Sequence, residues 1–155
     1  MRVSTLLTTL VSLTLPATAA LADTRYGCMA DNASVKLGVH VEFSRELGGK
    51  LSHLTGKLAL SGPDVPAALK ELQIKGDMVS QAWAGNGKLL MRFYDAHVVG
   101  APLYISLAAV SKGEDHTRMH GTYTLDQAQS KGPGFHQEGA LFCQIDEIKP
   151  TASAF

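Results

Sequence analysis

The sequence predicts an all-β fold: an antiparallel meander of about seven or eight strands closed as a small up-and-down barrel, with a β-sandwich as the alternative. Short segments of alternating apolar and polar residues follow one another, separated by turn signals at intervals of about ten residues. The chain has two cysteines, Cys28 in the first of these segments and Cys143 in the last. A bond between them would place the first and last strands side by side, so that the meander covers its own edges.

The two ends of the chain differ from this central part. Residues 1–22 have the features of a secretory signal peptide: Arg2 as the charged start, a short apolar core, and a small-residue cleavage site ending at Ala22. Its removal leaves one β domain over residues 23–148 and a proline-containing tail over 149–155 that we expect to be flexible. A periplasmic or secreted protein is therefore expected.

Two cysteines in an exported chain predict a disulfide bond, because the compartment is oxidising. The loop closed by Cys28 and Cys143 would exceed about 100 residues, for which the chain-entropy estimate of stabilisation is roughly 4–5 kcal/mol. Two buried free thiols, or a metal-binding pair, are the alternative.

The clearest strand is 35–44, which follows a shorter candidate strand at 26–30. Its odd-numbered positions are apolar and its even-numbered positions are mostly polar, so one face belongs to the core. Gly48-Gly49 predicts a two-residue hairpin turn, which would place Phe43 opposite Leu54 on the next strand. The apolar faces of the two strands then coincide.

The stretch 65–83 allows two interpretations. Asp64 can cap a short helix, and Asp77 can begin a second helical turn. Residues 79–83 also fit a strand. We therefore expect one or two short helical turns near 65–83, and leave helix or strand open at 77–83.

Three more strands and a closing run follow. Asn86-Gly87 is a strong hairpin signal and leads into a strand at 88–94. Residues 103–110 are nearly all apolar, which indicates a strand that is covered on both sides or lies centrally. Segments 118–125 and 135–145 alternate and form the last antiparallel pair.

Charge and motifs exclude several function classes. The chain carries 14 basic and 14 acidic residues without a run of like charges, which argues against nucleic acid as a partner. No stretch approaches the roughly 20 apolar residues of a membrane helix, so the protein is not expected to be membrane-embedded. A Gly-x-Ser-x-Gly elbow is missing and no carboxylate pair stands out, so we expect no enzyme and no cofactor.

A metal site is one hypothesis, because the chain has six histidines. The candidate ligands are His116 and His120, joined across the last hairpin by His136 and Glu138. This grouping assumes that Thr124 lies opposite His136. A zinc- or copper-like ion needs three or four such ligands at about 2.0–2.3 Å, and a solvated polar face is the alternative.

Ligand binding in a barrel mouth is the main functional prediction. Strands punctuated by Gly56, Gly121 and Gly139 resemble those of lipocalin- or avidin-type calycins in general style, which implies a small, mostly apolar ligand. No diagnostic motif of either family is present. The residues expected to line such a cavity are Leu89, Met91, Phe93, Leu103, Ile105, Met119 and Tyr123.

The alternative is a protein-interaction or inhibitor module with a filled core and a periplasmic protein as partner. It would act through the loops at 95–102 and 126–134, beside an exposed patch that could include Trp83 or Phe135.

Overall fold

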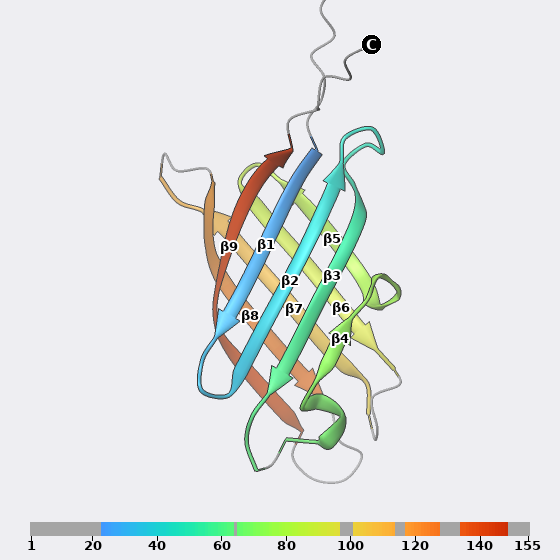
Figure 1. The fold of residues 1–155 in the computed structure, drawn as a ribbon, viewed down its shortest axis with the longest axis vertical. Helices are drawn as coiled ribbons and strands as arrows, with labels where there is room; N and C mark the ends of the chain where they lie inside the picture. The colour runs from blue at the N-terminus through green and yellow to red at the C-terminus, as the bar shows by residue number, and fades with distance from the viewer. Residues whose placement is uncertain (1–22, 64, 97–100, 114–116, 128–133, 149–155) are drawn as a thin grey trace, which may run out of the picture.

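The computed structural model describes residues 23–63, 65–96, 101–113, 117–127 and 134–148. Within them, nine strands form one antiparallel sheet that curls into a half-barrel (Figure 1). The strands are β1 (Asp23–Asp31), β2 (Val35–Ser44), β3 (Lys50–Leu60), β4 (Leu72–Ile74), β5 (Val79–Gly85), β6 (Lys88–Asp95), β7 (Leu103–Ser111), β8 (Arg118–Gln127) and β9 (Phe135–Ile148). Two 3-10 turns, η1 (Ala67–Leu69) and η2 (Gly76–Met78), lie between β3 and β5. The predicted all-β antiparallel meander with short helical turns is confirmed.

Strands adjacent in the chain are adjacent in the sheet, with the exception of β4 and β5, and one further pairing joins β1 to β9. The strand order is therefore β4-β3-β2-β1-β9-β8-β7-β6-β5, a single curled sheet rather than the two layers of a sandwich. The sheet edges are β4 and β5, which follow one another in the chain. Some Cα atoms of β3 and β5 come within 8 Å of each other, so the sheet curls back towards itself across a seam.

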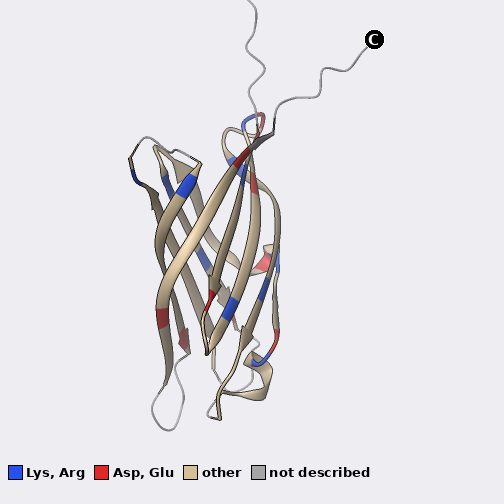
Figure 2. Ribbon diagram, turned by 60° about the vertical axis from the view of Figure 1, so that its left-hand side comes forward, with Lys and Arg blue, Asp and Glu red and all other residues tan. Residues whose placement is uncertain are grey.

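The core lies on the inner side of the sheet because side chains alternate between the two faces of each strand. The inner face is apolar, whereas Lys, Arg, Asp and Glu are dispersed over the strands and turns (Figure 2). The completely buried residues are Leu58, Leu69, Leu103, Leu107, Met119, Tyr123, Leu125 and Cys143. No helix in the described ranges is long and apolar enough to cross a bilayer. The predicted signal segment 1–22 and the tail 149–155 lie outside these ranges.

Cys28 and Cys143 form a disulfide bond, as predicted. They lie directly opposite each other on β1 and β9, with their Cα atoms 4.0 Å apart, and both are buried. The bond therefore joins the first and last strands inside the core. Such a bond is typical of an oxidising, extracytoplasmic compartment.

The β2–β3 hairpin has the predicted faces but not the predicted register. Val41, rather than Phe43, lies opposite Leu54. The connection is longer than a two-residue turn, because Gly49 N donates to the Ser44 carbonyl. In addition, Ser52 is an extra residue on β3 beside Glu42 of β2, which makes a β-bulge.

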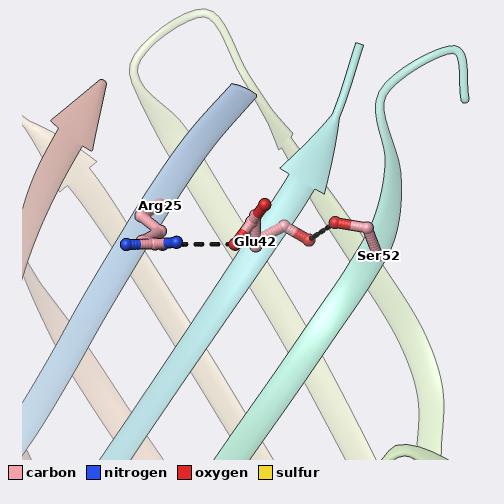
Figure 3. Close-up of polar contacts among 3 residues, drawn as sticks. All are labelled: Arg25, Glu42 and Ser52. Atoms are coloured by element: carbon pink, nitrogen blue, oxygen red, sulfur yellow. Dashed lines mark hydrogen bonds and ion pairs between the residues drawn. The ribbon is translucent and has the colours of Figure 1, made fainter. Parts of the chain in front are cut away.

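The bulge is held by a polar chain on the outer face. Ser52 Oγ donates to the main-chain carbonyl of Glu42 over 3.0 Å, and the Glu42 side chain accepts from Arg25 Nε over 3.2 Å (Figure 3). These contacts link β1, β2 and β3. Because of the extra residue, Phe43 and Leu51 both face inward at the end of the hairpin.

The stretch 65–83 contains both kinds of structure. Residues 76–78 form η2, and the strand β5 begins directly after it, so the strand interpretation of 79–83 is correct. η1 forms at 67–69, where Leu69 is buried, and its N-cap is Pro66 without a side-chain bond. Asp64, the expected cap, lies outside the described residues.

The Asn86-Gly87 hairpin is confirmed. Asn86 and Gly87 have φ angles of 49° and 68°, the left-handed values that a two-residue turn of this type requires. β7 lies centrally between β6 and β8 as predicted, but it is covered on one side only. Tyr104 and Val110 on its outer face are 48% and 38% exposed, since no second layer covers them in the described chain.

A close approach of side chain and backbone explains one inner glycine. Gly139 lies opposite Tyr123, and a Cβ at position 139 would come within 2.8 Å of the Tyr123 ring. The Tyr123 hydroxyl accepts a 2.9 Å hydrogen bond from Asn32 Nδ2, which also holds the β1–β2 turn through its side-chain oxygen. Gly139 thus makes room for a ring that ties β8 to this turn.

We expect replacement of both Cys28 and Cys143 by Ala to lower the free energy of unfolding by roughly 4–5 kcal/mol, because the unfolded chain loses a long-loop constraint. Urea denaturation followed by circular dichroism measures this. The wild-type protein under reducing conditions is the control, because it lacks the bond but keeps both cysteine side chains. If the free energy of unfolding of the double variant and of the reduced wild type each lies within about 1 kcal/mol of the oxidised wild type, the bond is not a main source of stability.

Gly139→Ala should destabilise the fold by about 1–3 kcal/mol, because the new methyl group overpacks against Tyr123. Gly38→Ala is the matched control: a Cβ there meets nothing within 4 Å. The same urea measurement should find Gly38→Ala within about 0.5 kcal/mol of wild type. Equal effects of the two substitutions would contradict this account of Gly139.

Candidate ligand-binding site

The residues predicted to line a cavity all lie in the packed core. Leu89, Met91, Phe93, Leu103, Ile105, Met119 and Tyr123 are each no more than 2% exposed and belong to one cluster. They come from the inner faces of β6, β7 and β8. The structure therefore brings all seven together, but as side chains that pack the interior rather than line a cavity.

A hollow of about 330 Å³ lies above this packed region, at the end where β1 begins and β9 ends, the upper end in Figure 1. We call it the mouth hollow. Its lining comes from β1, β2, β5, β7, β9 and two turns: Thr24, Tyr26, Phe43, Arg45, Gly49, Ala84, Gly85, Asn86, Gly87, Ser111 and Ile145.

The deep part of the mouth hollow is apolar. Tyr26 and Phe43 are buried, with ring centroids 5.7 Å apart and ring planes at 89°, an edge-to-face contact. Ile145 and Ala84 are partly buried and pack against the same core. Phe43 faces inward because it continues the alternation of β2, and the bulge at Ser52 places Leu51 of β3 opposite it.

The rim of the mouth hollow is polar. Ser111 donates from its main-chain N to the Gly87 carbonyl over 2.8 Å and from Oγ over 3.3 Å, which fixes the β5–β6 turn against the end of β7. On the other side, the main-chain N of Arg45 donates to Asp23 Oδ1 over 3.1 Å. Burial raises the pKa of the Tyr26 hydroxyl, and the positive charge of Arg45 acts in the opposite direction.

A larger hollow, of about 550 Å³, lies beside β4 and η2 near the other end of β6. It is bordered by Lys75, Asp77, Tyr94 and Asp95, among others, and Met78 is its one buried lining residue in the described chain. Exposed side chains of both charges make it an open surface groove. The mouth hollow is the better candidate, because small-molecule sites combine an apolar interior with a few converging polar groups.

The proposed metal ligands do not come together in the described residues. The register of β8 and β9 places Thr124 opposite Glu138, so the assumed pairing with His136 is wrong by two residues. His120 lies opposite Phe142, about 20 Å along β9 from His136 at some 3.3 Å per residue. Across the described ranges, no group of three or more His, Cys, Asp or Glu could hold a metal ion, and His116 lies outside them.

His136 instead forms a small acid–base group on the outer face. Its Nδ1 lies 2.6 Å from Asp126 Oδ1, and its Nε2 lies 3.9 Å from Glu138 Oε2. The hydrogen bond with Asp126 raises the pKa of His136, with a smaller contribution from Glu138, although partial desolvation opposes the shift.

The outer wall of the half-barrel carries an exposed apolar area. Trp83, the only tryptophan of the chain, is 45% exposed and borders a hollow of about 280 Å³ together with Leu90 and Val110. We call this area the wall patch. Phe135, the other residue expected in such a patch, is half-buried on β9 and packs against the core. The middles of the loops 95–102 and 126–134 lie outside the described residues.

Sequence reasoning missed the residues of the mouth hollow. Alternation correctly placed Phe43 on the inner face, but it did not indicate which inner residues lie at the open end. No sequence pattern indicated a role for Arg45, because it belongs to the β2–β3 connection, which is longer than the predicted two-residue turn. Comparisons with known protein families, with curated proteins and with solved structures give no match.

His136 should titrate above the ordinary histidine pKa of 6.5 in an NMR titration of its ring protons. The contact of protonated His136 with Asp126 stabilises the fold fully below the unfolded-state pKa, and this contribution is lost as the pH rises through the higher folded-state pKa. Asp126→Asn should return the pKa towards its ordinary value, and Glu138→Gln should change it less. An unchanged pKa in Asp126→Asn would contradict the assignment.

Proposed function

We propose that this protein is an exported, non-enzymatic binding module that holds a small, mostly apolar ligand in the mouth hollow. The observation that carries the proposal is an aromatic floor, formed by Tyr26 and Phe43, beneath a polar rim at one end of an otherwise filled half-barrel. Features of the sequence support export, since residues 1–22 have the pattern of a signal peptide and the disulfide suits the periplasm or the extracellular space.

The size of the hollow sets the size of the ligand and its affinity. A volume of about 330 Å³ is at the lower end of small-molecule sites. Burial of about six methylene groups contributes roughly 5 kcal/mol. Before the cost of immobilising the ligand, this corresponds to a dissociation constant of roughly 0.2 mM. Weak, reversible binding of small amphipathic molecules is the expected behaviour.

The neutral fluorescent probe N-phenyl-1-naphthylamine tests the proposal. Its emission should rise when it enters the apolar part of the hollow, and Ala84→Phe should reduce its affinity at least about tenfold, because the new ring fills the space. Gln81→Phe places the same ring on the outer face of the same strand and should leave the affinity within about twofold. Equal probe binding by all three proteins would reject the mouth hollow as the site.

A second candidate function is recognition of a protein in the same compartment through the wall patch. The exposure of Trp83 beside an apolar hollow favours it, because exposed aromatic residues of this kind often anchor interfaces. A photo-crosslinking residue placed at position 83 should capture a discrete partner in the producing cell. The same residue at position 57, exposed on β3, is the control, and identical crosslinking from both positions would remove this candidate.

A further inference from the structure

We propose that the mouth hollow selects anionic amphipaths: molecules with one carboxylate-type head and a short apolar tail. The head would lie at Arg45 and the Tyr26 hydroxyl, and the tail along Phe43 and Ile145. This inference rests on the proposed binding function and adds the chemical class of the ligand.

The charge of the lining has one sign. Arg45 is the one charged residue among the described residues that border the hollow, and no Asp or Glu belongs to that lining. The Asp23 carboxylate, which does not belong to the lining, accepts the main-chain N–H of Arg45. In the described part of the chain, the Arg45 guanidinium forms no ion pair, so its hydrogen-bond donors remain available to a ligand.

Arg45 and Tyr26 act on the same region of the hollow. The guanidinium is close enough to Tyr26 to influence the ionisation of its hydroxyl, although the two residues lie on different elements. Because burial outweighs this influence, the Tyr26 pKa is raised, so the hydroxyl keeps its proton at neutral pH and can donate to an anion. Two donors of this kind favour a carboxylate over a cationic head.

The apolar floor excludes a bare inorganic anion as the best ligand. Tyr26 and Phe43 are buried at 8% and 4% exposure, and an ion held at the rim would leave their inner surface unused. A tail that covers these rings adds hydrophobic burial to the charge-assisted contact at Arg45. The fit therefore requires both parts in one molecule.

Octanoate and 1-octanol form a matched probe pair, since they share a chain length and differ in the charged head. Titrations are followed by NMR chemical shifts of the Phe43 and Ile145 side chains at pH 7. In the wild-type protein, octanoate should bind about tenfold more tightly than octanol, as expected for one charge-assisted contact. This preference should weaken as the salt concentration rises.

Arg45→Gln should abolish the preference by weakening octanoate binding about tenfold, whereas octanol binding should weaken much less; a circular dichroism spectrum like that of the wild type shows that the variant is folded. Arg25→Gln is the charge-matched control, because Arg25 lies on the outer wall in an exposed pair with Glu42, and it should keep the wild-type preference. Octanol bound as tightly as octanoate, or a preference that survives Arg45→Gln, would overturn this inference and leave the proposed function intact. Failure of both probes to bind would overturn the two together.

Discussion

The pairing of β1 with β9 is the interaction on which the rest of the structure depends. All other neighbouring strands of the sheet are also neighbours in the chain, but β4 and β5 do not pair, so these local pairings alone would give two separate sheets, β1 to β4 and β5 to β9. The β1–β9 ladder moves both terminal strands to the centre of the sheet. Its long sequence separation makes it entropically costly, and the buried Cys28–Cys143 bond offsets this cost by restricting the unfolded chain.

The candidate site results from the small residues and the β-bulge at the mouth end of the half-barrel. Below the mouth, large inner side chains from facing strands meet and fill the space. At the mouth, the lining includes Gly49, Ala84, Gly85 and Gly87, which leave room above the Tyr26 and Phe43 rings. The bulge beside Glu42 places Leu51 opposite Phe43 there, and the polar chain of Arg25, Glu42 and Ser52 holds that bulge from outside.

Much of the fold could be predicted because alternation, turn glycines and cysteines are local signals. The strand at 35–44, the Asn86-Gly87 turn and the disulfide follow from them directly. Register could not be predicted, because side chains alternate with a period of two and a shift by two residues leaves every side chain on the same face. The error in the β8–β9 pair is a shift of this kind, and so is the error in the β2–β3 pair as far as the bulge, beyond which the shift is three residues. In the second pair, the true register moves His120 two residues further along β9 from His136.

The position of the site was harder to predict for a related reason. Hydrophobicity indicates that Met91 and Tyr123 lie inside, but not whether space remains beside them, since this depends on which side chains face each other across the sheet. Arg45 and Gly49 belong to a turn, and their relation to Tyr26 and Ala84 depends on the curl of the whole sheet. The curl follows from the β1–β9 pairing, which no single segment encodes.

The seam between β3 and β5 gives the mouth hollow a mechanical role. Ala84 and Gly85 belong to one edge strand, whereas Phe43 and Gly49 belong to the β2–β3 hairpin across the seam. A molecule in the hollow would touch both sides and act as a cross-brace between parts of the sheet that no ladder joins in the described chain. The disulfide stiffens the opposite wall, where β1 pairs with β9. A bound molecule would therefore mainly control the width of the seam between β3 and β5.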